Sequence, residues 1–441
     1  MIKKLLHIAS RDGNRQVVSN VFSLSALQVA NAILPLIAVP YIVRVIGPRD
    51  YGTIAFAQAF VTYFVLLVNY GFDLSASREI ARIREDKAKL TDTFWSVMWT
   101  KSVLFVISFV VFFSLLLTVK RVQEDWRVMA VTFLILIGYV AFPTWLFQGL
   151  EKLELTAVFY FLIKVIFTAG IFAFVRERGD FWVVPLLASL GQIVAGVLSF
   201  AYARVKLVKG IRPPSLRRMW SEIRSGSAIF LATIFVSFYT SSNVVILGFF
   251  ATQEKVGYFA GATKIVMALQ ALMLTPIAQA TYPHIGKLMA EDRTKGGEYL
   301  KKIAFLVMLI TLPASIGLFA FAPLIVKIVL GSAFLPSVPL LKIVSPFPVM
   351  VGLTTVFGYQ GVLNLNMDRK FFAVMAVAVA LNILLNVILA GRLQEIGTAI
   401  AWLVTEIYIA CAFTVIMQRS GIGILNFAFY KEWLNKVFKG G

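Results

Sequence analysis

Runs of about 20 mostly apolar residues recur along this chain, and they constrain its fold more than any other feature. A helix that crosses a lipid bilayer needs about 20 such residues. With glycines, prolines and charges as boundaries, we expect six spans in the first half, at 18–43, 52–71, 97–119, 128–149, 155–175 and 181–203. Six more are expected in the second half, at 227–250, 256–280, 303–322, 340–363, 372–391 and 396–417. The sequence therefore predicts an all-α membrane protein of about twelve transmembrane helices in two pseudo-symmetric six-helix lobes.

The composition agrees with a protein that is solvated by lipid. Of the 441 residues, 59% are hydrophobic and 15% are charged, against about 45–50% and about 25% in soluble proteins. A globular core cannot bury so large an apolar excess.

The basic residues are distributed unevenly between the two sides of the predicted membrane. The chain has 42 Lys and Arg against 22 Asp and Glu. With the N-terminus in the cytoplasm, the cytoplasmic connections hold 28 Lys and Arg, and the opposite connections hold 10. Such an excess is typical of cytoplasmic loops. We therefore expect both termini in the cytoplasm, and the net charge needs no nucleic-acid partner to explain it.

An internal repeat relates the two halves. The segment 51–57 matches 256–262, and 85–89 matches 291–295, at offsets of 205 and 206 residues. Halves of six helices each enter the membrane facing the same way, as in parallel-repeat transporters. We expect an N-terminal lobe at 1–210, a basic cytoplasmic linker at 211–226, a C-terminal lobe at 227–423 and an amphipathic cytoplasmic tail at 424–441.

Residues from which a catalytic centre is built are scarce. The sequence has two histidines, His7 and His284, and one cysteine, Cys411. No metal cluster, glycine-rich phosphate loop or Cys/His nucleophile pair can be assembled from them. The sequence therefore predicts a transporter rather than an enzyme, with no cofactor and no metal.

Charged side chains within the predicted spans are the best indicators of function. Lys164 and Glu406 lie at the centres of the fifth and twelfth spans, and Lys264 lies within the eighth. A charge at the bilayer centre costs about 2.5–3.5 kcal/mol on insertion scales, so such residues usually face a bundle interior or a water-filled cavity. Lys101 and Lys342 lie near span ends, where a lysine either faces a cavity or extends its ammonium to the interface. Glu406 is either functional or the partner of a buried lysine.

Uncharged polar residues form a second set within the spans. Interhelical hydrogen bonding is their commoner use, although together they suggest a wet cavity suited to a polyhydroxylated substrate. The set is Gln28, Asn31, Gln58, Gln148, Gln192, Asn243, Gln270, Gln279, Gln360, Asn382 and Asn386.

Stretches near the N-terminus resemble a known family. They are LQVANAILPL (27–36), PYIVRVIGP (40–48), YGTIAFAQAF (51–60) and YGFDLSASREI (70–80). They resemble the O-antigen and polysaccharide repeat-unit flippases, a polysaccharide transport family of the multidrug/oligosaccharidyl-lipid/polysaccharide exporter superfamily. The twelve-span layout extends the likeness over nearly the whole chain.

The resemblance implies a flippase of the bacterial inner membrane. Its substrate would be an undecaprenyl-pyrophosphate-linked oligosaccharide, moved from the cytoplasmic to the periplasmic leaflet by alternating access. Besides this substrate and the bilayer, the implied partners are the polysaccharide polymerase and the chain-length regulator of the same pathway.

The candidate site residues come from both arguments. The matching stretches supply the substrate-binding candidates Arg44, Arg78, Gln28, Asn31 and Gln58, and the coupling candidate Asp73. The physical argument adds Lys101, Lys164 and Lys264 for binding and Glu406 for coupling.

Two other functions remain open at this point. One is a cation-coupled multidrug exporter of the same superfamily, although a lysine-rich cavity would repel organic cations. The other is a membrane polymerase or ligase of the same pathway, which short outer loops without a catalytic cluster disfavour.

Overall fold

The computed structural model describes residues 12–422, with the side chains of 12–36, 153, 236 and 239 outside the description. The described residues lie in helices and their connections, with no strand among them. They divide into two compact units, residues 1–234 and 235–441. The predicted lobes at 1–210 and 227–423 and the linker between them stay a prediction, and the predicted tail at 424–441 lies outside the described residues.

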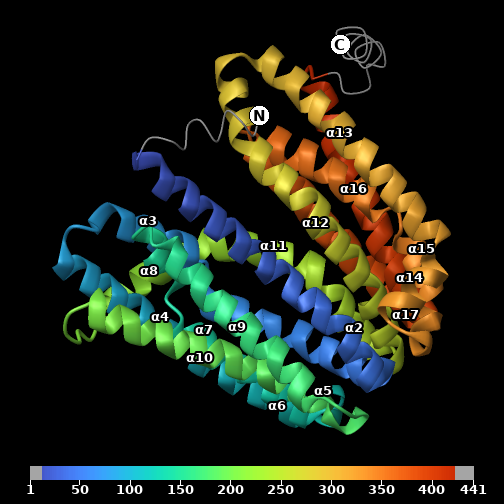
Figure 1. The fold of residues 1–441 in the computed structure, drawn as a ribbon, viewed down its shortest axis with the longest axis horizontal. Helices are drawn as coiled ribbons and strands as arrows, with labels where there is room; N and C mark the ends of the chain where they lie inside the picture. Colours follow the sequence, from blue (N-terminus) through green and yellow to red (C-terminus); the bar gives the residue numbers. More distant parts are fainter. Residues whose placement is uncertain (1–11, 423–441) are drawn as a thin grey trace. The chain divides into compact units, whose positions relative to one another are not determined.

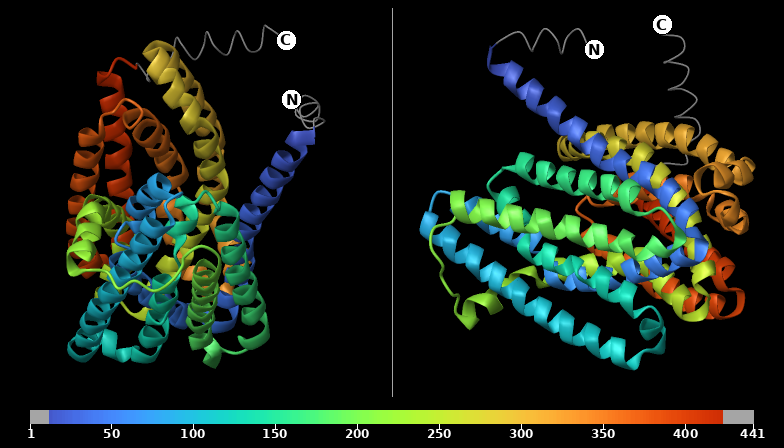
Figure 2. Two further views of the ribbon diagram at one scale, coloured as in Figure 1. Left: turned by 90° about the vertical axis from the view of Figure 1, so that its left-hand side faces the viewer. Right: turned by 60° about the horizontal axis from the view of Figure 1, so that its bottom comes forward.

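The first unit is a bundle of long helices connected by short turns (Figures 1 and 2). A kink at Gly47, with φ 77°, divides its longest helix into two spans. The elements are α2 (Asp12–Asn69), α3 (Phe72–Ile83), α4 (Lys87–Thr118), α5 (Lys120–Glu124), α6 (Trp126–Phe133), α7 (Ile135–Ala141), α8 (Thr144–Gly149), α9 (Leu153–Phe174), η1 (Arg178–Trp182), α10 (Val183–Lys206) and the beginning of α11 (Leu216–Phe250).

The second unit begins within α11 and ends in the long helix α17. A kink at Gln394, with φ 51°, divides α17 into two spans. The other elements are α12 (Gln253–Glu291), α13 (Arg293–Ala320), α14 (Ala322–Val329), η2 (Ser332–Ser337), α15 (Val338–Val344), α16 (Phe347–Leu353), η3 (Thr354–Val362, a π-helix) and α17 (Asp368–Arg419).

The described helices include many that are long enough to cross a membrane. Among the described residues, nine segments are long and apolar enough to cross a membrane, and α11, bent between Phe235 and Thr240, adds a tenth. The last of the nine is kinked at Gln394, and α2, which leads into the first of them, is kinked at Gly47. The described residues therefore contain nine or ten candidate spans and no strand, and the predicted all-α membrane fold is confirmed.

Asp86 and Asp292, which occupy equal positions in the repeat, cap helices in the same way. Each carboxylate accepts backbone N–H bonds from the residues two and three positions further on, at the start of α4 and of α13. The N–H of Lys89 lowers the pKa of Asp86, and that of Lys295 lowers the pKa of Asp292, because both donors stabilise the charged form. This part of the repeat therefore has the same local structure in both units.

Glycines allow helices of the first unit to pack at backbone distance. A Cβ at Gly138 of α7 would lie 2.5 Å from the carbonyl oxygen of Gln192 in α10, and one at Gly196 would lie 2.5 Å from the carbonyl oxygen of Gly138. Small residues at such crossings are how helices associate closely in lipid. The pair fixes α7 against α10.

Aromatic side chains fill the core of the second unit. Phe371 and Phe413 stack with their ring centroids 5.2 Å apart, both buried, and Phe357 belongs to the same cluster. A Cβ at Gly358 would lie 2.6 Å from the Phe413 ring, so this crossing also requires a glycine. The core holds η3 against α17 and thereby places the polar residues described next.

Candidate functional site

A groove of about 400 Å³ follows α12 in the second unit. Its polar groups are amides and hydroxyls, and Gln270 and Gln279 are among those expected from the sequence. The Nε2 atom of Gln270 is buried and has no hydrogen-bond partner within the described residues. The groove is lined by Met267, Gln270, Ala271, Leu274, Thr275, Ala278, Gln279, Val351 and Thr355.

Lys264 lies on the same face of α12 as the groove. It precedes Met267, Ala271 and Thr275 by three, seven and eleven residues, a spacing that puts the four side chains on one side of a helix. The lysine is exposed and forms no ion pair or hydrogen bond with another described residue. One helix face therefore carries a cation followed by neutral hydrogen-bonding groups.

Glu406 lies inside the second unit, behind this face. It is 2% exposed, and its Oε1 accepts a hydrogen bond from Thr354 at 3.1 Å. Thr354 begins the π-helix η3, whose next residue, Thr355, lines the groove. Single π-turns inside helices often mark functional sites. Among the described residues of this unit, the hydrogen-bond partner of Glu406 is thus the hydroxyl of Thr354 and not a lysine.

Three asparagines predicted from the sequence meet inside the second unit. Asn386 Nδ2 donates to Asn243 Oδ1 at 2.7 Å and to Asn382 Oδ1 at 3.2 Å. Ser242 donates to Asn382 at 3.3 Å, and Asn382 donates to Thr405 at 3.4 Å. All five residues are at most 3% exposed. They join α11 to both parts of α17, as the interhelical hydrogen-bonding interpretation predicted.

The candidates in the first unit come from several helices, α2, α3 and α9 among them. Arg44, Gln58 and Arg78 are exposed, and Lys164 is half-buried in α9. The backbones of Gln28 and Asn31 lie in α2, but their side chains are outside the description. Lys342, in the second unit, is exposed and lies 5.5 Å from the centroid of the Phe319 ring.

Asp73 and Lys101 lie near each other in the first unit. Lys101 of α4 is 1% exposed, and its Nζ donates to the carbonyl oxygen of Tyr139 at 2.6 Å. The Asp73 carboxylate accepts a hydrogen bond from Thr144 and interacts electrostatically with Lys101. Lys101 is therefore enclosed, and its ammonium does not extend to the membrane surface.

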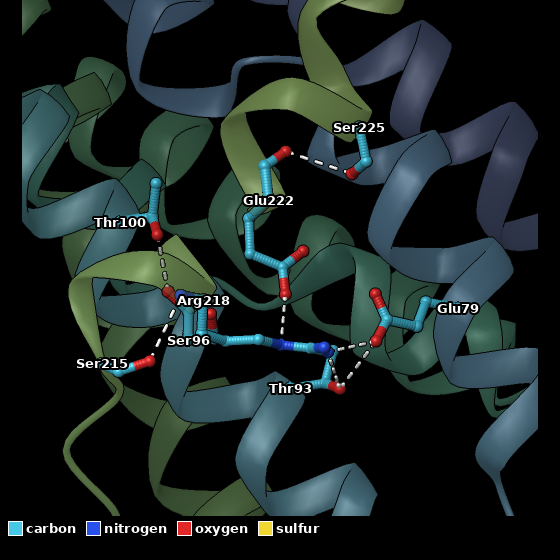
Figure 3. Close-up of polar contacts among 8 residues, drawn as sticks. All are labelled: Glu79, Thr93, Ser96, Thr100, Ser215, Arg218, Glu222 and Ser225. Atoms are coloured by element: carbon cyan, nitrogen blue, oxygen red, sulfur yellow. Dashed lines mark hydrogen bonds and ion pairs between the residues drawn. The ribbon is translucent and has the colours of Figure 1, made fainter. Parts of the chain in front are cut away.

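Sequence reasoning missed a charged cluster where α11 begins (Figure 3). Arg218 donates to Glu79 of α3 and, at 3.1 Å, to Thr93 of α4. Its Nε also lies 3.2 Å from Glu222 Oε1, and Glu222 is only 2% exposed. One guanidinium thus faces two carboxylates and holds the first turns of α11 on the first unit.

The only signal for this cluster was the spacing of Arg218 and Glu222, four residues apart. Arg218 belongs to the predicted basic linker at 211–226, and nothing in the sequence pairs it with Glu79. A pocket of about 410 Å³ lies beside the cluster, and the exposed pair Arg212 and Asp92, 2.9 Å apart, lines it.

Solved structures of known transporters share this fold. The structure titled "Lipid II flippase MurJ, inward closed conformation" matches with a TM-score of 0.72 at 13% identity, covering 94% of this chain and 92% of that one. An inward-facing multidrug resistance MATE family transporter of the MOP superfamily matches with a TM-score of 0.68 at 17% identity, covering 91% and 96%. The chain therefore has the twelve-helix fold of these transporters.

Sequence comparison narrows this class to a family. The family model described as "Polysaccharide biosynthesis protein" matches residues 17–289. An Escherichia coli (strain K12) protein described as "Putative O-antigen transporter" is 34% identical over 387 residues, covering 88% of this chain and 93% of that one. The chain belongs to the polysaccharide biosynthesis protein family of multi-pass membrane proteins, and the family resemblance predicted from the N-terminal stretches is confirmed.

Proposed function

We propose that this protein is a flippase that moves an undecaprenyl-pyrophosphate-linked oligosaccharide from the cytoplasmic to the periplasmic leaflet of the bacterial inner membrane. The relationship to a described O-antigen transporter supports the substrate class. The observation that carries the proposal is the α12 face, where the exposed Lys264 precedes a groove with Gln270, Thr275 and Gln279.

The chemistry of this face suits a lipid-linked sugar. A pyrophosphate is anionic, and a lysine binds it through charge-assisted hydrogen bonds. Sugar hydroxyls both donate and accept hydrogen bonds, and amides match both requirements. The Nε2 of Gln270 is buried at the groove and lacks a partner among the described residues, so it is a donor that such a ligand would satisfy if the side chain turned toward it. In the first unit, we propose Arg44, Arg78 and Lys164 as anion-binding residues, with Gln28, Asn31 and Gln58 as neutral contacts.

The proposed direction follows from the membrane potential. Moving one negative charge out of a negative interior gains about 2.3 kcal/mol per 100 mV. We place both termini in the cytoplasm, consistent with the distribution of 28 and 10 basic residues. Glu406, and Asp73 in the first unit, are the acidic groups that we assign to ion or proton coupling. The polymerase and the chain-length regulator of the pathway are the proposed protein partners.

The MATE-like fold also fits a multidrug exporter, but Lys264 disfavours it. A cavity for organic cations presents acids or aromatic faces to its ligand. The groove side of α12 instead presents an ammonium without a partner among the described residues. The exporter predicts drug resistance in a sensitive strain, and the flippase predicts none.

Complementation of a flippase-null strain tests the proposal. Lys264→Ala should lower surface polysaccharide by about tenfold or more, because it removes a charge-assisted contact of about 1.5–3 kcal/mol. The matched control is Lys342→Ala, since Lys342 is exposed in the same unit but lies over Phe319 and not at the groove. Equal complementation by both variants, at equal membrane abundance, would remove Lys264 from the site. A parent chain that restores no polysaccharide but confers drug resistance would refute the flippase.

A further inference from the structure

The fourth span of the first unit is broken at a proline. The helix α7 ends at Ala141 and α8 begins at Thr144, with Phe142 and Pro143 between them outside any helix. In a continuous helix, the carbonyl of Tyr139 would accept a hydrogen bond from the backbone N–H of residue 143. Proline has no N–H, so this carbonyl loses its partner within the span.

Lys101 supplies the missing donor from another helix. Its Nζ lies 2.6 Å from the carbonyl oxygen of Tyr139. An unsatisfied carbonyl is costly within a membrane-spanning bundle, where neighbouring side chains must replace water as partners. Because Lys101 is 1% exposed, its ammonium lies in the protein interior.

Asp73 holds the other side of the same break. Thr144, the first residue of α8, donates its hydroxyl hydrogen to the Asp73 carboxylate. Asp73 also interacts electrostatically with Lys101. Lys101 of α4 therefore contacts the residues before the break, and Asp73 of α3 contacts those after it.

The halves of the span are also fixed to different neighbours. On α7, Gly138 meets the backbone of α10 at Gln192. On α8, a Cβ at Gly149 would lie 2.6 Å from the Cβ of Ile80 in α3. Both glycines lie so close to their neighbours that α7 and α8 cannot move far from them. Straightening the span would therefore break one of the two contacts.

We propose that Lys101 and Asp73 are positioning residues that keep the fourth span broken and thereby set the place of α3, which carries Arg78. Lys101 replaces the N–H that Pro143 lacks, and Asp73 anchors α8. This arrangement is independent of the substrate, and only the transport readout of its test rests on the proposed function.

Removing and restoring the donor tests the proposal. In a Cys411→Ser background, spin labels at Ile137→Cys on α7 and Gln148→Cys on α8 report the bend. A straight helix would separate these positions by about 16 Å along its axis. The variants are Lys101→Met, Lys101→Arg and Lys101→Met with Pro143→Ala, compared by label distance, thermal-unfolding midpoint and transport per folded protein.

Lys101→Met should lower the midpoint by about 3 °C or more and broaden the label distances, because the Tyr139 carbonyl loses its donor. Lys101→Arg should keep both values, since a guanidinium still donates. The double variant should regain the midpoint, because residue 143 again has an N–H, with the label distance of a straight helix and transport at least tenfold below the parent.

Three outcomes would overturn the proposal. Lys101→Met with an unchanged midpoint and unchanged distances shows that the ammonium does not hold the break. A double variant that transports like the parent shows that the break is not needed. If Lys101→Met fails to fold, a double variant that also fails to fold contradicts the backbone argument, and one that folds supports it.

Two variants of Asp73 distinguish its positioning role from a role in ion or proton coupling. Asp73→Asn keeps an acceptor for Thr144, so the bend and the midpoint should stay as in the parent, whereas Asp73→Ala should change both. A change of bend in Asp73→Asn equal to that in Asp73→Ala would contradict the positioning role. Lost transport in Asp73→Asn with an unchanged bend instead bears on the coupling assignment alone.

Discussion

The two units bury their polar groups in different chemical forms. Apart from hydroxyls, the described residues of the first unit bury two charged groups, Lys101 at 1% and Glu222 at 2% exposed, and one amide, Gln192 at 5%. Those of the second bury four amides, each at most 1% exposed, and one charged group, Glu406 at 2%; the amides are Asn243, Gln360, Asn382 and Asn386. The charges of the first unit lie where regular structure is interrupted, at the broken fourth span and at the start of α11. The three asparagines join helices away from such interruptions, whereas Gln360 lies in the π-helix η3.

The difference indicates which structural role suits a buried charge and which suits a buried amide. A charge is expensive to bury, and in the first unit Lys101 and Glu222 lie where a backbone carbonyl or another charge pairs with them. An amide both donates and accepts and costs less to bury, which suits contacts between helices. We therefore expect the first unit to be more sensitive to removal of a single side chain than the second.

The largest effect on stability is expected at Arg218. Arg218→Ala leaves Glu79 and Glu222 without their cation, and we expect the free energy of unfolding to fall by about 2 kcal/mol, below the 3–5 kcal/mol of fully buried pairs because solvent screens the partly exposed Arg218 and Glu79. Chemical unfolding in detergent measures this change. Adding Glu222→Gln should recover part of the loss, because it removes the buried charge.

Arg212→Ala is the matched control for Arg218. Arg212 pairs with Asp92 at 2.9 Å, but both side chains are at least half exposed. Such pairs contribute about 0–1 kcal/mol. If Arg212→Ala costs as much as Arg218→Ala, burial of the charge is not what distinguishes the cluster, and the comparison between the units fails at this point.

A smaller effect is expected from the asparagines of the second unit. In a double-mutant cycle of Asn243→Ala and Asn386→Ala, the coupling energy should be about 0.6 kcal/mol and at most about 1.7 kcal/mol, as for hydrogen bonds in other membrane bundles. As a control, Thr281 bonds to Gln360 and to no member of the asparagine network, so a cycle of Asn243→Ala and Thr281→Ala should show no coupling. A coupling energy larger than the loss of unfolding free energy caused by Arg218→Ala would show that the second unit is the more sensitive to loss of a polar side chain.

The sequence predicted the span layout well because lipid imposes a simple length rule on apolar runs. Kinks at Gly47 and Gln394 fall between predicted spans, and the spacing of Asn382 and Asn386, four residues apart, puts them on one helix face. The partners of charged residues could not be predicted, because they come from helices distant in sequence. Lys101 and Tyr139 illustrate this. The sequence shows that Pro143 lacks an N–H, but which side chain donates to the Tyr139 carbonyl in its place depends on how the helices pack.

The same limit applies to the candidate site. Lys264 and the glutamines of α12 were identified because charges and amides are rare in apolar runs. The hydroxyls of Thr275 and Thr355 were not, because threonine is common in membrane helices and only the fold shows which of them line the groove. Glu79 was overlooked although it lies in a stretch that carried the family resemblance, since nothing in that stretch indicates its partner Arg218.

The smallest effect, and the one that should be equal in both units, concerns the helix caps Asp86 and Asp292. Asp86→Ala and Asp292→Ala should each lower the thermal-unfolding midpoint by less than Arg218→Ala and by the same amount, because each removes one N-cap of the same geometry. Asp86→Asn and Asp292→Asn, which keep an acceptor, are the controls.

The pH dependence of these caps has a definite sign. Both folded-state pKa values are lowered by backbone N–H bonds, from Lys89 and Lys295 respectively. Their contribution is therefore complete above the unfolded value of about 3.9 and is lost as the pH falls through the folded value. The difference in midpoint between the parent and either alanine variant should thus be constant near neutral pH and shrink in acid. Unequal differences for Asp86 and Asp292 would show that the repeat has diverged at this turn, and that the contrast between the units extends to their caps.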